Sequence, residues 1–188
     1  LVKYIVLFAQ EPVFPNGGHV KDCMWYYGNN DVRGATWNPK TGKMVLEKKG
    51  IIDVRNELVQ MIDASTKVAA VLGSDEHAYH KVLIDKTGPV GKPGEKENIS
   101  PMDDLKHATW YIVSGGAGAP YYSKEPSPWN RFWEKNPDRE EHNWAEKGAF
   151  HYSSQANIFI FRADRQTISM EVYNPYGERI DFFPDMMV

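Results

Sequence analysis

The chain has 188 residues, of which 41% are hydrophobic and 13% aromatic. This is enough for one sizeable core and too little for two independent domains, so residues 1–188 are expected to form a single domain. The formal charge of −3 and the pI near 6.1 give no electrostatic reason to expect nucleic acid or an anionic membrane as the main partner. The apolar runs are shorter than the roughly 20 residues that a bilayer span requires. The single cysteine, Cys23, excludes an internal disulfide framework.

The N-terminal stretch is nearly continuously apolar from residue 2 to 9, which predicts a strand covered on both faces. The run ends at Gln10, and the prolines and glycines that follow predict an irregular loop. The sequence starts directly with this strand, without an initiator Met or the graded regions of a signal peptide. We therefore expect a further segment upstream of Leu1.

The next stretch, residues 23–50, is dense in aromatic side chains and is expected to be structured, with a short hairpin around Pro39 to Lys43. Beyond it the apolar residues recur at helical spacing. This predicts a helix over about 54–64 with Asp53 as its N-cap. A short apolar strand over 67–72 follows.

Polar side chains gather in the loop after that strand, where Asp75, Glu76, His77 and His80 lie close together in sequence. Strand, helix, strand in this order implies two parallel strands whose ends emerge on one edge of a sheet, so Gln10 should lie near this loop. In an extended loop Asp75 and His77 point the same way. Their oxygen and nitrogen atoms suit zinc, manganese or iron. The alternative is a solvated turn in which a carboxylate caps a backbone amide.

The second half of the chain predicts a strand at 110–113 that runs into a glycine-rich loop. This loop lacks the Lys-Ser/Thr pair of a phosphate-binding P-loop. Residues 121–149 are polar and aromatic and predict a lid or a surface loop. The tail predicts three antiparallel strands, at 157–164, 167–173 and 180–183.

Three of these segments resemble sequence blocks of the calcineurin-like metallophosphoesterases. Residues 5–22 contain FAQEPVFPNGGHVKD, residues 67–84 contain GSDEHAY, and residues 109–122 contain YIVSGGAGAPYY. The resemblance implies an α/β (α+β) fold, namely part of an αββα sandwich with a mixed sheet and antiparallel C-terminal strands. It also implies hydrolysis of phosphoric esters by a metal-activated hydroxide, with Mn, Fe or Zn as the divalent ions.

The same resemblance assigns roles to individual residues. Asp75 and His77 would be metal ligands, although Asp75 replaces a histidine, and Gln10 stands where the family usually has another metal-binding histidine. An amide oxygen is a harder and weaker donor than imidazole, so Gln10 should bind zinc poorly. Gln10 either alters the metal preference or only hydrogen-bonds its own loop. Contacts to the substrate or to the metal ligands are implied for His19, Asp22, Glu76 and Tyr79.

Two functional hypotheses follow. In the first, the chain is the C-terminal half of a metallophosphoesterase, whose bridging aspartate, asparagine and leaving-group histidine would lie before Leu1. The upstream segment and a phosphate ester would then be its partners, and the chain alone would be inactive. In the second, the chain is a non-catalytic binding or structural module that keeps the fold with a degenerate metal site.

Overall fold

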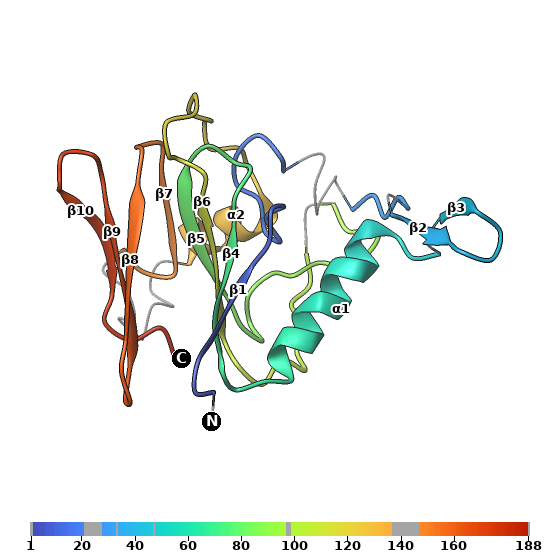
Figure 1. Ribbon diagram of the computed structural model, residues 1–188, viewed down its shortest axis with the longest axis horizontal. Helices are drawn as coiled ribbons and strands as arrows, with labels where there is room; N and C mark the ends of the chain where they lie inside the picture. The colour runs from blue at the N-terminus through green and yellow to red at the C-terminus, as the bar shows by residue number, and fades with distance from the viewer. Residues whose placement is uncertain are drawn as a thin grey trace.

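The structure is a computed structural model that describes residues 2–20, 28–32, 34–46, 48–96, 99–136 and 147–187. The described residues form a mixed α/β fold (Figure 1). In chain order its elements are β1 (Ile5–Phe8), β2 (Ala35–Asn38), β3 (Lys43–Leu46), α1 (Ile51–Asp63), β4 (Val68–Gly73), β5 (Tyr79–Ile84), β6 (Thr109–Ser114), α2 (Pro128–Lys135), β7 (Phe150–Ser153), β8 (Ile158–Ala163), β9 (Ile168–Tyr173) and β10 (Arg179–Phe183). Within the described ranges, neither helix has the length and hydrophobicity of a bilayer-spanning segment.

A mixed five-stranded sheet has the order β1-β4-β6-β5-β7. Strands β1, β4 and β6 are parallel, whereas β5 is antiparallel to both β6 and β7. The predicted parallel pair on either side of α1 is confirmed. The strand that follows the polar loop in sequence, β5, does not pair with β4, because β6 lies between them.

The first strand differs from its prediction. Among the residues that the structure describes, strand β1 pairs only with β4 and therefore lies at the edge of the sheet. Its residues are at most half-buried, and Phe8 is 78% exposed. The prediction of a strand covered on both faces was wrong, because an apolar run does not reveal whether a strand is central or at an edge.

Helix α1 begins at Ile51 rather than near residue 54, and Asp53 lies inside its first turn. The orphan N–H groups of this turn are satisfied by a residue from the preceding loop, since Asn30 Oδ1 accepts hydrogen bonds from the N–H groups of Ile52 and Asp53. Asp53 is therefore not the N-cap; its carboxylate accepts a hydrogen bond from Asn30 Nδ2 at 2.5 Å.

The tail forms the predicted three-stranded antiparallel sheet, with the order β10-β9-β8. This sheet packs on one face of the five-stranded sheet, where the Trp110 and Phe183 rings meet edge to face at 4.9 Å. A fully buried ion pair also joins the two sheets, because Lys81 Nζ lies 2.8 Å from Asp181 Oδ2. Figure 1 shows the two sheets side by side, with α1 on the far side of the larger one.

Both helices contribute to the opposite face of the five-stranded sheet. Phe14 lies at the centre of this layer and contacts the rings of Tyr111 in β6 and Trp129 in α2 at 4.7 and 5.2 Å. The guanidinium of Arg55 in α1 lies over Phe14, 5.2 Å from the ring centroid, and donates to the carbonyls of the Val90–Gly91 turn. The described residues therefore form three layers, one helical and two of sheet.

Helix α2 lies inside the stretch predicted to be a lid or a surface loop. Ser127 caps it by accepting a hydrogen bond from the Asn130 N–H, and Pro128 occupies the first turn. Its buried tryptophans fix it to the sheet, since the Trp133 Nε1–H donates to the Leu83 carbonyl. For residues 128–135 the prediction of a loop was wrong, whereas residues 137–146 lie outside the described residues.

Candidate functional site

The carboxyl ends of β1 and β4 meet at one edge of the five-stranded sheet. The Ala9 N–H donates to the Leu72 carbonyl at 2.8 Å, and the Ser74 N–H donates to the Gln10 carbonyl at 3.0 Å. This confirms that the chain around Gln10 lies beside the polar loop. The main chain of Gln10 makes this contact, and Gln10 itself is exposed to solvent.

The polar loop is tightly turned rather than extended. The Glu76 N–H donates to the Ser74 carbonyl and the Ala78 N–H to the Glu76 carbonyl, at 2.7 and 2.8 Å. Asp75 has a φ of +64°, in the left-handed region that a non-glycine residue seldom adopts. The argument that two extended residues share a face therefore does not apply here. Backbone strain of this kind often accompanies a functional site.

Asp75 faces a histidine from the loop after β1. Its Oδ2 lies 3.6 Å from His19 Nε2, and both side chains are partly accessible to solvent. The ring of Tyr122 lies beside His19, with centroids 5.8 Å apart. A carboxylate and an imidazole, separated by more than 50 residues in sequence, are thus brought together at this edge.

His77 is held on its other side by the glycine-rich loop after β6. Its Nδ1 lies 2.7 Å from the Pro120 carbonyl oxygen. Since a carbonyl can only accept, Nδ1 carries the proton, and in the neutral ring Nε2 then keeps a lone pair. The ring stacks on Tyr122 with centroids 4.5 Å apart and planes inclined by 28°. Tyr122 therefore contacts both His19 and His77.

The glycine-rich loop fits closely over the polar loop. The Gly115 N–H donates to the Ala78 carbonyl at 3.1 Å, and a Cβ at Gly115 would lie only 2.0 Å from the Glu76 carbonyl oxygen. Only glycine allows this approach. Sequence reasoning did not single out Pro120 or Tyr122, since neither residue type signals an orienting role.

Glu76 has a structural position beneath the site. It is fully buried, and its two oxygens accept hydrogen bonds from the N–H groups of Asn16, Gly17 and His19 and from His80 Nε2. Burial alone raises the pKa of Glu76, but the hydrogen bond from His80 and those from the backbone outweigh it, so the pKa lies below its ordinary value. The carboxylate fixes the loop that carries His19.

His80 extends this buried network to helix α2. Because Asn16 Nδ2 donates to His80 Nδ1 at 3.2 Å, the ring carries its proton on Nε2 and donates it to Glu76 at 2.6 Å. Asn16 Oδ1 in turn accepts from the Ser127 hydroxyl at 2.8 Å. The network thus connects the polar loop, the loop after β1 and the start of α2.

Two other expected site residues do not join this cluster. Tyr79 lies on the opposite face of β5, fully buried, and its hydroxyl donates to Asp181 at 2.6 Å. Burial raises the pKa of Tyr79 well above its ordinary value, with further contributions from Asp181. Tyr79 therefore stabilises the packing of the two sheets. Asp22 lies outside the described residues.

The described donors at this edge do not make up a metal-binding group. Among the residues that the structure describes, no three His, Cys, Asp or Glu side chains are grouped closely enough to hold an ion. The donor types at this edge, one carboxylate and two imidazoles, nevertheless suit a borderline divalent ion.

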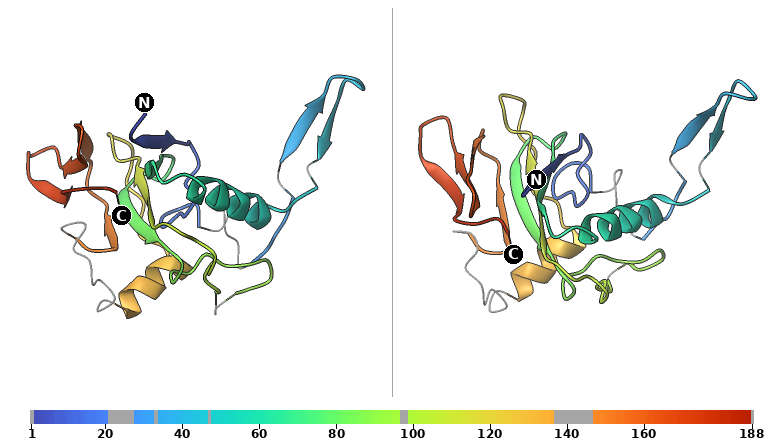
Figure 2. Two further views of the ribbon diagram at one scale, coloured as in Figure 1. Left: turned by 90° about the horizontal axis from the view of Figure 1, so that it is seen from below. Right: turned by 60° about the horizontal axis from the view of Figure 1, so that its bottom comes forward.

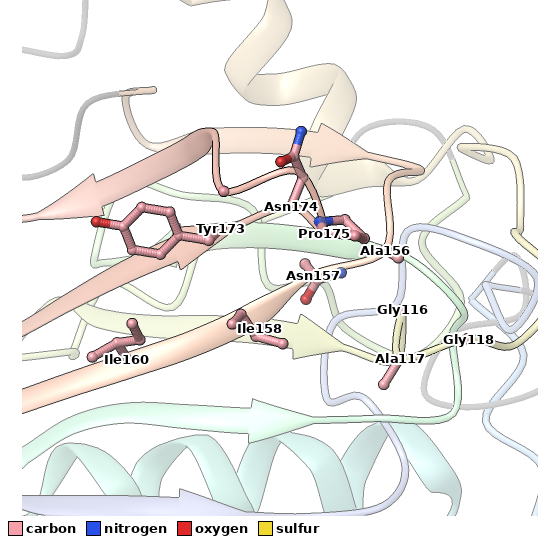
Figure 3. A pocket seen from close by; sticks show the side chains of 11 residues that line it. Gly116, Ala117, Gly118, Ala156, Asn157, Ile158, Ile160, Tyr173, Asn174 and Pro175 are labelled. Atoms are coloured by element: carbon pink, nitrogen blue, oxygen red, sulfur yellow. The ribbon is translucent and has the colours of Figure 1, made fainter.

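A separate pocket of about 560 Å³ lies where the outer face of β8 meets the Gly116–Gly118 loop (Figure 3). Ile158, Ile160 and the ring of Tyr173 form its wall. The amide of Asn157 is already hydrogen-bonded to Ser114 Oγ and the Gln155 carbonyl. The lining is therefore mainly apolar.

Comparison with known proteins assigns no family. No protein-family model matches the chain, and no curated protein or solved structure is significantly similar to it.

Proposed function

We propose that this chain carries one side of a divalent-metal centre in a phosphoric ester hydrolase, with His77 and Asp75 as ligands and His19 in contact with Asp75. The observation that carries the proposal is the orientation of His77. Metal-binding imidazoles usually donate their second N–H to a carbonyl or a carboxylate, which fixes the ring and its tautomer. The bond from Nδ1 to the Pro120 carbonyl does this, and stacking on Tyr122 restrains the ring further.

The chemistry of the donors supports the same assignment. His77 Nε2 and the Asp75 carboxylate are the ligand types that zinc, manganese and iron accept. His19 lies within reach of Asp75, and Gln10 could add a weak oxygen ligand from the neighbouring strand end. When bound, such ions polarise a phosphoryl oxygen and lower the pKa of a bound water. Full coordination needs further ligands from residues beyond the described cluster.

The finer fold assignment belongs to the same proposal. In an αββα metallophosphoesterase sandwich, a second helical layer would cover the three-stranded sheet. The outer face of that sheet has apolar side chains that such a layer would bury, since Ile158 is 60% exposed and Ile160 is 37% exposed. The helical layer, the mixed sheet and the antiparallel sheet already described agree with the remaining three layers.

A second candidate is a non-catalytic module with a degenerate site. It is favoured by the lack of a three-ligand group among the described residues. It is also favoured by the complete use of the Glu76 carboxylate in structural hydrogen bonds. The two candidates differ in whether the folded chain binds a divalent ion at His77.

Thermal unfolding with and without manganese or zinc separates them. A ligand that binds only the folded state stabilises it by about 2.7 kcal/mol at a hundredfold excess over its Kd. For a chain of this size, this corresponds to a rise in Tm of about 5–10 °C. We expect such a rise in the wild-type chain and its loss in His77→Ala and Asp75→Asn.

The matched controls are His107→Ala and Asp103→Asn, which change the same residue types in surface-accessible positions elsewhere. Both should keep the metal-induced rise. Equal metal responses in His77→Ala and His107→Ala would refute the site. We also expect no sustained hydrolysis of a chromogenic phosphate monoester by the chain alone, because these side chains cannot saturate two divalent ions. Turnover that His77→Ala abolishes would contradict that expectation.

A further inference from the structure

A two-stranded arm projects from the body of the molecule. Within the described part of the chain, strands β2 and β3 pair only with each other, in the register Ala35 to Leu46, Trp37 to Met44 and Asn38 to Lys43. Figures 1 and 2 show this hairpin at the far end of the long axis, beyond the start of α1. We call residues 34–46 the arm.

The turn of the arm is encoded locally. The Asn38 carbonyl accepts the Gly42 N–H at 2.9 Å, and its side-chain oxygen accepts the Lys40 N–H at the same distance. Gly42 has a φ of +62°, which favours glycine. The hairpin around Pro39 predicted from the sequence is therefore confirmed, and the residues of the turn themselves encode the arm.

One face of the arm is apolar. Residues directly opposite each other in an antiparallel pair lie on the same face, as do residues two apart along a strand. Ala35, Trp37, Met44 and Leu46 therefore share a face. Trp37 is 60% exposed, Met44 61% and Leu46 71%. An isolated two-stranded hairpin is marginal in water, so this face requires a covering partner.

The arm is cationic although the chain as a whole is acidic. Lys40 and Lys43 lie at its tip and Lys48 at its base, and all three are exposed. Lys49 pairs with Glu57 of α1. Residues 34–50 contain four lysines and one acidic residue, Glu47. These lysines make the arm complementary to an anionic partner, although the formal charge of the whole chain is −3.

The placement of the lysines restricts the kind of partner. Lysine on an exposed strand opposes the addition of another strand, and two cationic arms repel each other. Both effects disfavour a second copy of the chain. A flat anionic lipid surface can both cover the apolar face and pair with the lysines. Trp prefers the boundary between lipid and water, and lysines extend to the headgroups. At that depth water can still satisfy the open edges of the hairpin.

We propose that the arm docks on an anionic lipid surface. The apolar face formed by Ala35, Trp37, Met44 and Leu46 lies at the boundary of headgroups and acyl chains. Lys40 in the turn and Lys48 at the base contact the anionic headgroups, whereas Lys43 pairs with Asn38 on the opposite face of the hairpin. The projection of the arm keeps the acidic body away from the negatively charged surface. This peripheral contact involves no membrane-spanning segment and is independent of the metal site.

The test is co-sedimentation of the chain with vesicles of phosphatidylcholine alone or of phosphatidylcholine mixed with phosphatidylserine. We expect binding only to the mixed vesicles, and weaker binding as salt is added. Lys40→Glu/Lys48→Glu should weaken binding roughly tenfold or more, since each basic residue near such a surface contributes several-fold to affinity. Trp37→Ser/Met44→Ser should abolish it.

The matched controls, Lys86→Glu/Lys96→Glu and Met61→Ser, alter exposed lysines and an exposed apolar side chain outside the arm and should bind as wild type does. As a milder variant, Trp37→Phe should retain binding but lose the part of the tryptophan quenching by brominated lipid that arises from the arm. Lack of binding to mixed vesicles, equal binding to both vesicle types, or indifference to the arm variants would overturn the proposal. Self-association of the chain that Trp37→Ser abolishes, without vesicle binding, would instead assign the face to a second copy.

Discussion

Replacement of Glu76 by glutamine tests the buried network beneath the candidate site. Each carboxylate oxygen accepts two N–H groups: Oε1 from Gly17 and His19, and Oε2 from Asn16 and His80. Glutamine has only one such oxygen. Two of the four donors therefore lose their acceptor and face an amide N–H₂ group. His80 cannot relieve the conflict by moving its proton, because Asn16 already donates to its Nδ1.

The loss of folding stability in Glu76→Gln can be calculated from these contacts. Hydrogen bonds to a charged acceptor contribute about 1.5–3 kcal/mol each, so the loss of two costs about 3–6 kcal/mol. Part of this is offset because a neutral amide is less costly to bury than a carboxylate. We expect a net loss of about 3 kcal/mol, which for a chain of this length lowers Tm by about 6–12 °C. Urea unfolding measures the same loss as a lower midpoint with an unchanged slope.

The pH dependence identifies the cause. The folded-state pKa of Glu76 lies below its ordinary value of 4.5, so its charge stabilises the fold above that pH, and the stabilisation is lost as the pH falls through the folded pKa. The difference between wild type and Glu76→Gln should therefore shrink below about pH 4.5. Glu134→Gln, which changes a surface ion pair with Lys124, should cost no more than about 0.5 kcal/mol at any pH. An equally small effect of Glu76→Gln, or a difference that does not change in acid, would refute the reasoning.

Three further outcomes follow from other contacts. Asn30→Ala should lower the free energy of unfolding by about 1 kcal/mol through loss of the α1 cap, whereas Asn29→Ala, an exposed neighbour, should change it little; urea midpoints compare the two. Lys81→Met should cost about 3–5 kcal/mol by leaving Asp181 buried without its cation, and a double-mutant cycle with Asp181→Asn should show coupling above about 1 kcal/mol. Asp75→Gly should leave the melting temperature of the metal-free chain nearly unchanged, because relief of the positive φ offsets the freedom gained by the unfolded chain; it should abolish the response to manganese.

Local signals in the sequence were sufficient for much of the fold. The hairpin at Asn38 to Gly42 has a turn that its own residues specify, and the tail strands alternate between buried and outward residues. Helix α2 was missed although Ser127 followed by Pro128 is a helix-start signal, because the surrounding proline-rich stretch favoured a loop. Its two tryptophans contribute the packing that the local pattern lacked.

The contacts that define the candidate site are less visible to sequence reasoning. The sequence suggested that Glu76 contacts the substrate or the metal ligands, since nothing near it reveals three backbone donors from a distant loop. Asp75 and His77 were identified by type, but their geometry depends on a turn that an extended-loop argument could not anticipate. Pro120 and Tyr122 reach His77 because β6 lies between β4 and β5 in the sheet. This strand order is a property of the whole sheet and is not visible in any local stretch of sequence.

The buried network also sets when the site can appear during folding. The hydrogen bonds from Asn16 to Glu76 and His80 join residues 60 and 64 positions apart, and the bond to Ser127 spans 111 positions. Closing such long loops costs entropy before any contact repays it, so contacts of this kind form late and slow the search for the native state. A chain that has formed its sheets but not yet docked α2 would lack the fixed loop that carries His19. In a refolding experiment, the metal response should therefore return with the last kinetic phase rather than with the secondary structure.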